Sequence, residues 1–190
     1  MKKRMSRWKD ENGNLIPAAG WIPFNSLGIW VIAEKWGKKK YYTDIGGRYR
    51  FDDGDIWATI AREFSEETYQ STCLTRDDII SLLPFSRRYL LRDSRGKICY
   101  LCCMIPTGQL SLRNKKLDWR KFQERRKEVI STNPHHTFRI CELRFLSYED
   151  LLSKRYCLSI RLKKMLPWIC SRYPDEFERL ATRCAESILE

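Results

Sequence analysis

Apolar residues follow one another almost without interruption in several short stretches of the chain, and this pattern predicts buried strands. The first is 27–34, in which both alternating sets of side chains are apolar, as in a strand that is covered on both faces. We expect this strand to be central and 41–45 to form a short second strand. The remaining strands are predicted at 88–91, 97–105 and 137–145, the first two of them joined by a hairpin turn at 93–96.

After Asp55 the apolar positions change to helical spacing. The carboxylate of Asp55 can cap the first turn of a helix, and the apolar residues from Ile56 to Phe64 recur on one face, which should be buried. Gly46 and Gly47 are predicted to form a turn that leads into this helix. Further helices are predicted after Thr75, over 112–129 and 158–169, and from Pro174 to about residue 189.

Composition limits the possible classes of protein. A chain of 190 residues is typical of a single domain, here 1–190, with 1–14 expected to be a loose basic arm. Eight cysteines without an apolar signal segment favour a reducing compartment such as the cytoplasm, with free thiols. Residues 15–33 carry no charge, but prolines and glycines interrupt them, so we expect no membrane span. The net charge of +12 favours a polyanionic partner, most simply nucleic acid or nucleotide.

Three carboxylates gather at the end of the predicted helix. Glu63, Glu66 and Glu67 are spaced i, i+3 and i+4, which places them on one side of the helix, beside the apolar face. Like charges one turn apart destabilise a helix by about 0.2–0.5 kcal/mol per pair, and a divalent cation would remove that repulsion. Hard oxygen ligands suit Mg²⁺ or Mn²⁺. The alternative is a solvated acidic face that is paired with Arg62 and other cations.

These residues resemble a known motif. Gly47, the acids Asp53 and Asp55, and the run Arg62-Glu-Phe-Ser-Glu-Glu67 are similar to the box of the Nudix hydrolase family. One extra residue separates Asp53 from Arg62, which leaves open whether Asp53 or Asp55 takes the place of the first acid. Tyr69 stands where the family usually has glycine, so we expect a helix exit without the usual left-handed glycine cap.

The resemblance extends beyond the box. The segments 97–104 and 138–152 are similar to the later strands and the closing helix of the family. The implied fold is an α/β/α sandwich with a mixed β-sheet, and the implied reaction is hydrolysis of a nucleoside diphosphate linked to another group. A weaker likeness points to the mRNA-decapping Nudix enzymes of large DNA viruses, which would place the protein in the host cytoplasm if it is viral.

The resemblance also implies a site for Mg²⁺ or Mn²⁺ made of oxygen ligands. The implied ligands are carboxylates and one glycine carbonyl: Glu66, Glu67, Glu63, Gly47 or its neighbour Gly46, and Glu142 from the later strand. Glu63 could instead accept the proton of the attacking water, and Arg62 would orient Glu63 through a charge-assisted hydrogen bond.

A basic segment at 112–130 resembles an insertion into this pattern. Its cations outnumber its acids, and we expect a helix whose outward face contacts RNA. The RNA-binding candidates are Arg120, Lys121, Arg125 and Arg126. The predicted substrate is the 5′ cap of mRNA; the alternatives are a small nucleotide (a dinucleotide, a nucleotide sugar or a damaged nucleoside triphosphate) and a catalytically silent RNA-binding protein. The sequence does not indicate an oligomeric state.

Two other clusters have simpler interpretations. Cys99 and Cys102 form a C-x-x-C, but no second pair with suitable spacing occurs, so both are predicted to be strand residues and not zinc ligands. His135 and His136 are predicted to lie in a polar loop near the candidate site.

Overall fold

The computed structural model describes residues 8–9, 13, 15–133, 139–153 and 155–171. Strands, α-helices and two short 3-10 helices alternate along the chain in this order: β1 (Trp8–Lys9), β2 (Leu15–Ile16), β3 (Ala18–Asn25), β4 (Gly28–Trp36), β5 (Lys39–Thr43), β6 (Ile45–Arg48), η1 (Phe51–Asp53), α1 (Ile56–Glu67), α2 (Arg76–Leu82), η2 (Leu83–Phe85), β7 (Arg87–Arg92), β8 (Ile98–Pro106), α3 (Thr107–Leu112), α4 (Trp119–Thr132), β9 (Ile140–Ser147), α5 (Tyr148–Leu152) and α6 (Ile160–Ser171).

A mixed seven-stranded sheet forms the centre of the molecule. Its main path runs β5-β4-β3-β8-β7, while β6 also pairs with β3 and β9 also pairs with β4. The β3–β8 pair is parallel and the other pairs are antiparallel. Asp44 alone separates β5 from β6, so at this residue the chain stops pairing with β4 and begins to pair with β3. The strands before and after Asp44 therefore pair with different neighbours in the sheet, which leaves the sheet split between β5 and β6 at this residue.

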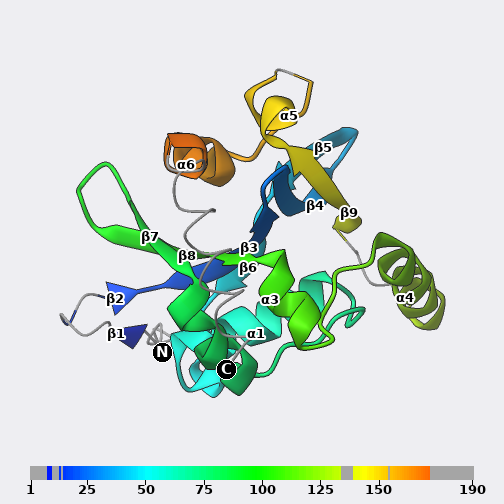
Figure 1. Cartoon of the computed structure of the whole chain (residues 1–190), viewed down its shortest axis with the longest axis horizontal. Helices are drawn as coiled ribbons and strands as arrows, with labels where there is room; N and C mark the ends of the chain where they lie inside the picture. Colours follow the sequence, from blue (N-terminus) through cyan, green and yellow to red (C-terminus); the bar gives the residue numbers. More distant parts are fainter. Residues whose placement is uncertain (1–7, 10–12, 14, 134–138, 154, 172–190) are drawn as a thin grey trace, which may run out of the picture.

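Helices cover both faces of the sheet, as Figure 1 shows with α1 and α3 on one side and α6 on the other. Along β4 the side chains alternate between the two cores: Trp30 and Ile32 pack on the side of α1, whereas Val31 and Ala33 pack on the side of α6. Burial on both faces explains the continuous apolar run of this strand. The predicted α/β sandwich with a mixed sheet is confirmed, and the strand predicted at 27–34 is central. It is not the first strand, because β3 precedes it and was not predicted.

Several local predictions are also confirmed. Thr75 caps α2, because its hydroxyl accepts a hydrogen bond from the amide of Asp78. β7 and β8 form the expected hairpin, and Cys99 and Cys102 lie in β8. The seven cysteines of the described residues are free thiols. No helix in the described part of the chain is long and apolar enough to cross a membrane.

Other local predictions need correction. Trp8 and Lys9 belong to a small two-stranded sheet with Leu15 and Ile16, so this part of the N-terminal arm is not loose. The helix predicted over 112–129 begins later than expected, because α3 ends at Leu112, residues 113–118 are not helical and α4 begins only at Trp119. The histidine pair and the predicted helix from Pro174 lie outside the described residues.

Candidate active site

The acidic helix α1 is fixed at its start by Asp55 and along its length by the core. The carboxylate of Asp55 accepts a hydrogen bond of 2.8 Å from the amide of Ala58, as predicted, and its second oxygen pairs with Arg76 at 2.7 Å. Ile56, Ile60 and Phe64 are fully buried or nearly so. This packing leaves the opposite side of the C-terminal turn, with its glutamates, facing a pocket.

The glycine pair does not form a turn. Gly46 and Gly47 lie in β6, opposite Gly20 and Ala19 of β3, and the turn before the helix is made by η1 and Gly54. The glycines are needed because other groups approach them closely. A Cβ on Gly47 would lie 2.5 Å from each oxygen of the Glu63 carboxylate. The missing side chain of Gly47 therefore provides the space in which that carboxylate lies.

Arg62 is held in place by acids on both sides. Its guanidinium donates to Asp53 at 2.6 and 2.9 Å, to Glu63 at 2.6 Å, and to the carbonyl oxygen of Arg48 at 2.9 Å. Burial alone would lower the pKa of Arg62, but these acids raise it. Arg62 therefore orients Glu63, as the resemblance implied. Asp53 is the acid that fixes Arg62, while Asp55 caps the helix.

The other two glutamates have different environments. Glu66 is about half exposed and forms a bidentate pair with Arg50, at 3.0 and 3.1 Å. Glu67 accepts a hydrogen bond of 2.6 Å from the amide of Gly46, and it forms no ion pair within the described part of the chain. Glu67 is therefore a carboxylate whose charge is not neutralised by a directly bonded cation.

Burial raises the pKa of two of the glutamates. For Glu67 the pKa lies well above its ordinary value, because burial and then repulsion from Glu63 disfavour the charge, against the hydrogen bond from Gly46. Burial also raises the pKa of Glu63, partly offset by Arg62. A cation beside both carboxylates would favour their charged forms.

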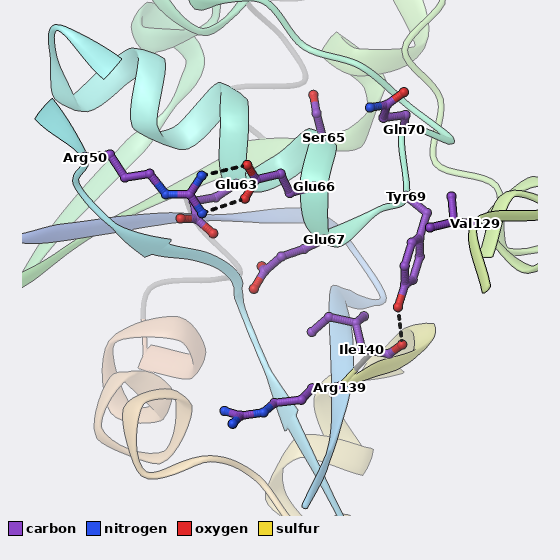
Figure 2. A pocket seen from close by; sticks show the side chains of 10 residues that line it. All are labelled: Arg50, Glu63, Ser65, Glu66, Glu67, Tyr69, Gln70, Val129, Arg139 and Ile140. Carbon is purple, nitrogen blue, oxygen red and sulfur yellow. Dashed lines mark hydrogen bonds and ion pairs between the residues drawn. The ribbon is translucent and has the colours of Figure 1, made fainter. Parts of the chain in front are cut away.

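These glutamates line a pocket of about 590 Å³, and Figure 2 shows them on one wall with Arg139 on the other. Most of the lining residues lie in α1 or directly after it, one lies just before η1, one in α4, and two at the start of β9. They are Arg50, Glu63, Ser65, Glu66, Glu67, Tyr69, Gln70, Val129, Arg139 and Ile140. The pocket combines acids that could hold a metal ion with two arginines that could contact phosphate.

The donor set of this pocket fits Mg²⁺ or Mn²⁺. These ions take oxygen ligands, and Mg²⁺ usually needs only one or two carboxylates, because water and substrate supply the rest. Glu67, which has no ion-pair partner among the described residues, would hold such an ion together with a neighbouring glutamate. Among the described residues no three acid, histidine or cysteine side chains already surround a common point; Glu63 and Glu66 are paired with Arg62 and Arg50.

The residues that follow α1 have a left-handed backbone conformation although neither of them is glycine. Tyr69 and Gln70 have φ of 53° and 57°, so two non-glycine residues take the strained conformation. The Tyr69 hydroxyl donates to the carbonyl oxygen of Ile140 at 2.6 Å, and its ring packs edge-on against Phe122 at 5.3 Å. These contacts with β9 and α4 compensate for the strain and attach the end of the acidic helix to the far wall of the pocket.

The structure does not bring Glu142 into this pocket. Glu142 accepts hydrogen bonds from Lys40, at 2.7 Å, and from Arg144. The β9–β4 register carries a bulge, so Glu142 opposes Ala33 and Ile140 opposes Glu34. The extra residue places Glu142 on the α6 face of the sheet, together with Ala33, whereas Ile140 stays on the α1 face. Glu142 is therefore not among the ligands that the pocket can offer.

The basic candidates on α4 fall into two groups. Arg120 and Lys121 are exposed, and Arg125 pairs with Glu128 at 2.6 Å. Arg126 is partly buried and donates to the carbonyl oxygen of Ile140 at 3.1 Å. Arg126 therefore joins α4 to β9, whereas Arg120 and Lys121 face outward.

Sequence patterns did not reveal a buried polar cluster behind the site. Asp44 is fully buried and accepts hydrogen bonds from Arg161 at 2.6 Å and from the hydroxyl of Tyr100. The guanidinium of Arg161 also lies 4.3 Å from the centre of the Tyr100 ring. A Cβ on Gly20 would collide with the Tyr100 hydroxyl, so Gly20 provides room for this cluster. Arg161 comes from α6, 117 residues after Asp44, and no local signal connects the two.

Comparison with known proteins gives distant structural likenesses. No family model and no curated protein matches the chain. A NUDIX hydrolase from Nitrosomonas europaea is similar at a TM-score of 0.44 and 13% identity, over 80% of this chain and 84% of that one.

A second similar structure is a bifunctional NMN adenylyltransferase/ADP ribose pyrophosphatase from Francisella tularensis, solved with AMP and a manganese ion. Its TM-score is 0.38 at 16% identity, over 96% of this chain. The chain spans 43% of the length of that protein.

Proposed function

We propose that the protein is a Nudix-type pyrophosphohydrolase that uses Mg²⁺ or Mn²⁺ and cleaves the diphosphate of a nucleotide linked to another group. The observation that carries this proposal is the pocket at the end of α1, which Glu63, Glu66 and Glu67 line while Arg62 is bonded to Glu63. A solvated acidic face would not need Gly47 to make room for a buried carboxylate. The arrangement also argues against a catalytically silent protein.

Each residue has a role that follows from its environment. Glu67 and Glu66 would hold the ion, Glu67 through a carboxylate that is already fixed by the Gly46 amide. When bound, the ion neutralises diphosphate oxygens and favours the ionisation of water. Glu63, oriented by Arg62, is the third ligand or the acceptor of the water's proton. Arg139, on the opposite wall, is placed to contact a substrate phosphate.

Within this reaction class we favour the 5′ cap of mRNA as substrate. The net charge of +12 and the exposed cations of α4 support a long polyanionic substrate. α4 also contributes Val129 to the pocket itself, so an RNA strand that leaves the pocket along this helix would meet Arg120 and Lys121. A small nucleotide would use the same pocket without these cations, and it is the alternative.

The first test removes the charge of Glu67. Glu67→Gln keeps the volume and leaves an oxygen that can still accept from Gly46, so the variant should fold. We expect turnover to fall on the order of 10²-fold or more. Added Mg²⁺ should raise the melting temperature of the wild type more than that of the variant. Glu124→Gln, an exposed glutamate of α4, is the control and should leave both quantities unchanged. Near wild-type turnover of Glu67→Gln at saturating Mg²⁺ would show the metal assignment to be wrong.

The second test separates the two substrates. Neutralising Arg120, Lys121 and Arg125 to Gln should weaken the binding of capped RNA and lower the slope of log affinity against log salt by roughly 0.7 for each lost phosphate contact. Hydrolysis of a free cap dinucleotide should hardly change. The matched control is Lys163→Gln with Lys164→Gln, two exposed cations of α6 on the other face of the sheet. If capped RNA is no better a substrate than small nucleotides and the triple variant behaves like the control, the small-nucleotide alternative is correct.

A further inference from the structure

The hairpin that joins β4 to β5 carries a strong positive charge. Residues 35–40, the hairpin tip, contain four lysines and no acid, and all six residues are exposed. One of the lysines, Lys40, pairs with Glu142 at 2.7 Å. The other three form no ion pair within the described part of the chain; they are Lys35, Lys38 and Lys39. The proposed reaction leaves these charges without a role.

Arg139 connects the hairpin tip to the pocket. The central carbon of its guanidinium lies 3.9 Å from the centre of the Trp36 ring, and its carbonyl oxygen accepts a hydrogen bond of 2.8 Å from the amide of Lys35. Figure 1 shows the hairpin beside β9, which follows Arg139. The same arginine lines the pocket opposite the glutamates (Figure 2) and pairs with no acid among the described residues. The pocket and the hairpin tip therefore share one guanidinium.

Two cations are neighbours of the Trp36 ring. Lys39 lies directly opposite Trp36 in the β4–β5 register, and opposed residues of antiparallel strands point to the same face of the sheet. Arg139 lies over the ring itself. The nearest acid along β4, Glu34, accepts from the indole N–H of Trp36 at 2.9 Å and pairs with no described cation. Neighbouring like charges repel each other, so an anion at this face would be stabilising.

The chemistry of the hairpin tip favours phosphate over a lipid surface. Trp36 is 50% exposed, but Arg139 covers its ring, and no other large apolar residue is exposed within 35–40. The tip therefore offers a bilayer little to insert. Lysine binds phosphate as a point charge, whereas a guanidinium that is fixed on an aromatic face binds it through directed N–H groups. The pocket and the tip together suit a ligand that carries phosphates at both places.

We propose that the hairpin tip binds the sugar-phosphate backbone of a single-stranded RNA whose 5′ end lies in the pocket, and that Trp36 positions Arg139 where the two meet. The inference rests on the proposed function and adds a contact surface that is distinct from α4. The cations of the tip come from β4, β5 and the turn between them, and they reach the pocket through Arg139, whereas α4 reaches it through Val129.

The first experiment measures the binding of a short single-stranded RNA at several salt concentrations, without Mg²⁺, so that hydrolysis plays no part. Lys38→Gln with Lys39→Gln should lower the slope of log affinity against log salt by roughly 1.4, because two phosphate contacts at about 0.7 each are lost. The matched control, Lys163→Gln with Lys164→Gln, removes the same charge from α6 and should leave the slope unchanged. Hydrolysis of a free cap dinucleotide with Mg²⁺ should be the same in all three proteins.

The second experiment tests the role of Trp36 in the same binding assay. Trp36→Ala should weaken RNA binding about threefold, the effect of one exposed cation–π contact, with little change in the salt slope, and Trp36→Phe should restore most of the affinity. In a protein that already carries Arg139→Gln, Trp36→Ala should have no further effect. The same threefold loss in that protein would show that Trp36 contacts RNA directly and does not act through Arg139.

The outcomes separate this inference from the proposed function. If the Lys38 and Lys39 double variant keeps the wild-type slope, or changes no more than the α6 control, the hairpin tip does not bind RNA, whether or not the protein hydrolyses nucleotides. The expected change of slope in a protein that hydrolyses none of the substrates would refute the proposed reaction and support the RNA surface. Binding to anionic phospholipid vesicles that the double variant loses, with RNA binding unchanged, would assign the tip to a membrane and overturn the inference.

Discussion

The substitution Gly47→Ala tests whether the site is built as described. A Cβ at this position would lie 2.5 Å from both oxygens of Glu63, about 1 Å closer than ordinary contact. The carboxylate is the far end of a flexible side chain, so it can move and the fold should survive. Its hydrogen bond of 2.6 Å with Arg62 would stretch to roughly 3.6 Å, beyond the usual range.

We therefore expect Gly47→Ala to lose activity without a matching loss of stability. A displacement of about 1 Å at a catalytic group costs on the order of 10²-fold in rate. The assay measures turnover of the substrate at saturating Mg²⁺ and, separately, the free energy of unfolding in urea. Near wild-type turnover would refute the reasoning, because it would mean that the position of Glu63 has no effect on the reaction.

Two other glycines serve as controls for this experiment. Gly37→Ala introduces strain only, since φ is +60° and nothing lies within 4 Å of the new Cβ; it should cost about 1–2 kcal/mol and leave turnover unchanged. Gly46→Ala would place its Cβ 2.5 Å from the carbonyl oxygen of Ala19, which is backbone and cannot move aside. It should destabilise the fold by about 1–3 kcal/mol or more. If Gly47→Ala loses activity only in proportion to its loss of stability, as expected for Gly46→Ala, then the substitution acts on the fold and not on the position of Glu63.

Two further predictions concern buried charges. Arg161→Leu leaves the fully buried Asp44 without its cation and should lower the free energy of unfolding by about 3–5 kcal/mol, and adding Asp44→Asn should restore part of it in the same urea titration. Burial would raise the pKa of Asp53, but hydrogen bonds from Arg62 and neighbouring groups lower this pKa overall. The ionised Asp53 therefore stabilises the fold at neutral pH, and this contribution is lost as the pH falls below about 4, through the pKa of the folded state. Stability curves of wild type and Asp53→Asn should converge at low pH; parallel curves would contradict the ion pair.

The sequence predicts the acidic helix well because its signals are local. The cap at Asp55, the apolar face and the spacing of the glutamates all lie within one short segment, and each is governed by the geometry of a single helix. The role of Arg62 is predicted for the same reason, since Glu63 is its neighbour in the chain. These parts of the site need no knowledge of the tertiary structure.

The errors arise where distant segments meet. Gly46 and Gly47 resemble a turn in sequence, but the close approach of β3 and of Glu63 is what requires them. Glu142 was implied as a ligand by the family resemblance, as an acid just inside a later strand. The bulge opposite Ala33 and Glu34 breaks the regular alternation of that strand and turns Glu142 to the other face. No pattern within 137–145 indicates where such a bulge falls.

The split in the sheet connects the buried cluster to the glutamates. β6 pairs with β3 on one edge only, and at Gly46 the peptide groups of the other edge are not used in the sheet. The amide of Gly46 donates to Glu67 at 2.6 Å, and its carbonyl oxygen accepts from Arg161 at 3.4 Å. Gly46, at the open edge of β6, thus bonds both to the carboxylate of Glu67 and to the guanidinium of Arg161. Since an unpaired buried amide or carbonyl is costly, Arg161 and Glu67 fix the same strand edge from opposite faces of the sheet. α6 is therefore connected to Glu67 through Gly46, although α6 contributes no residue to the pocket.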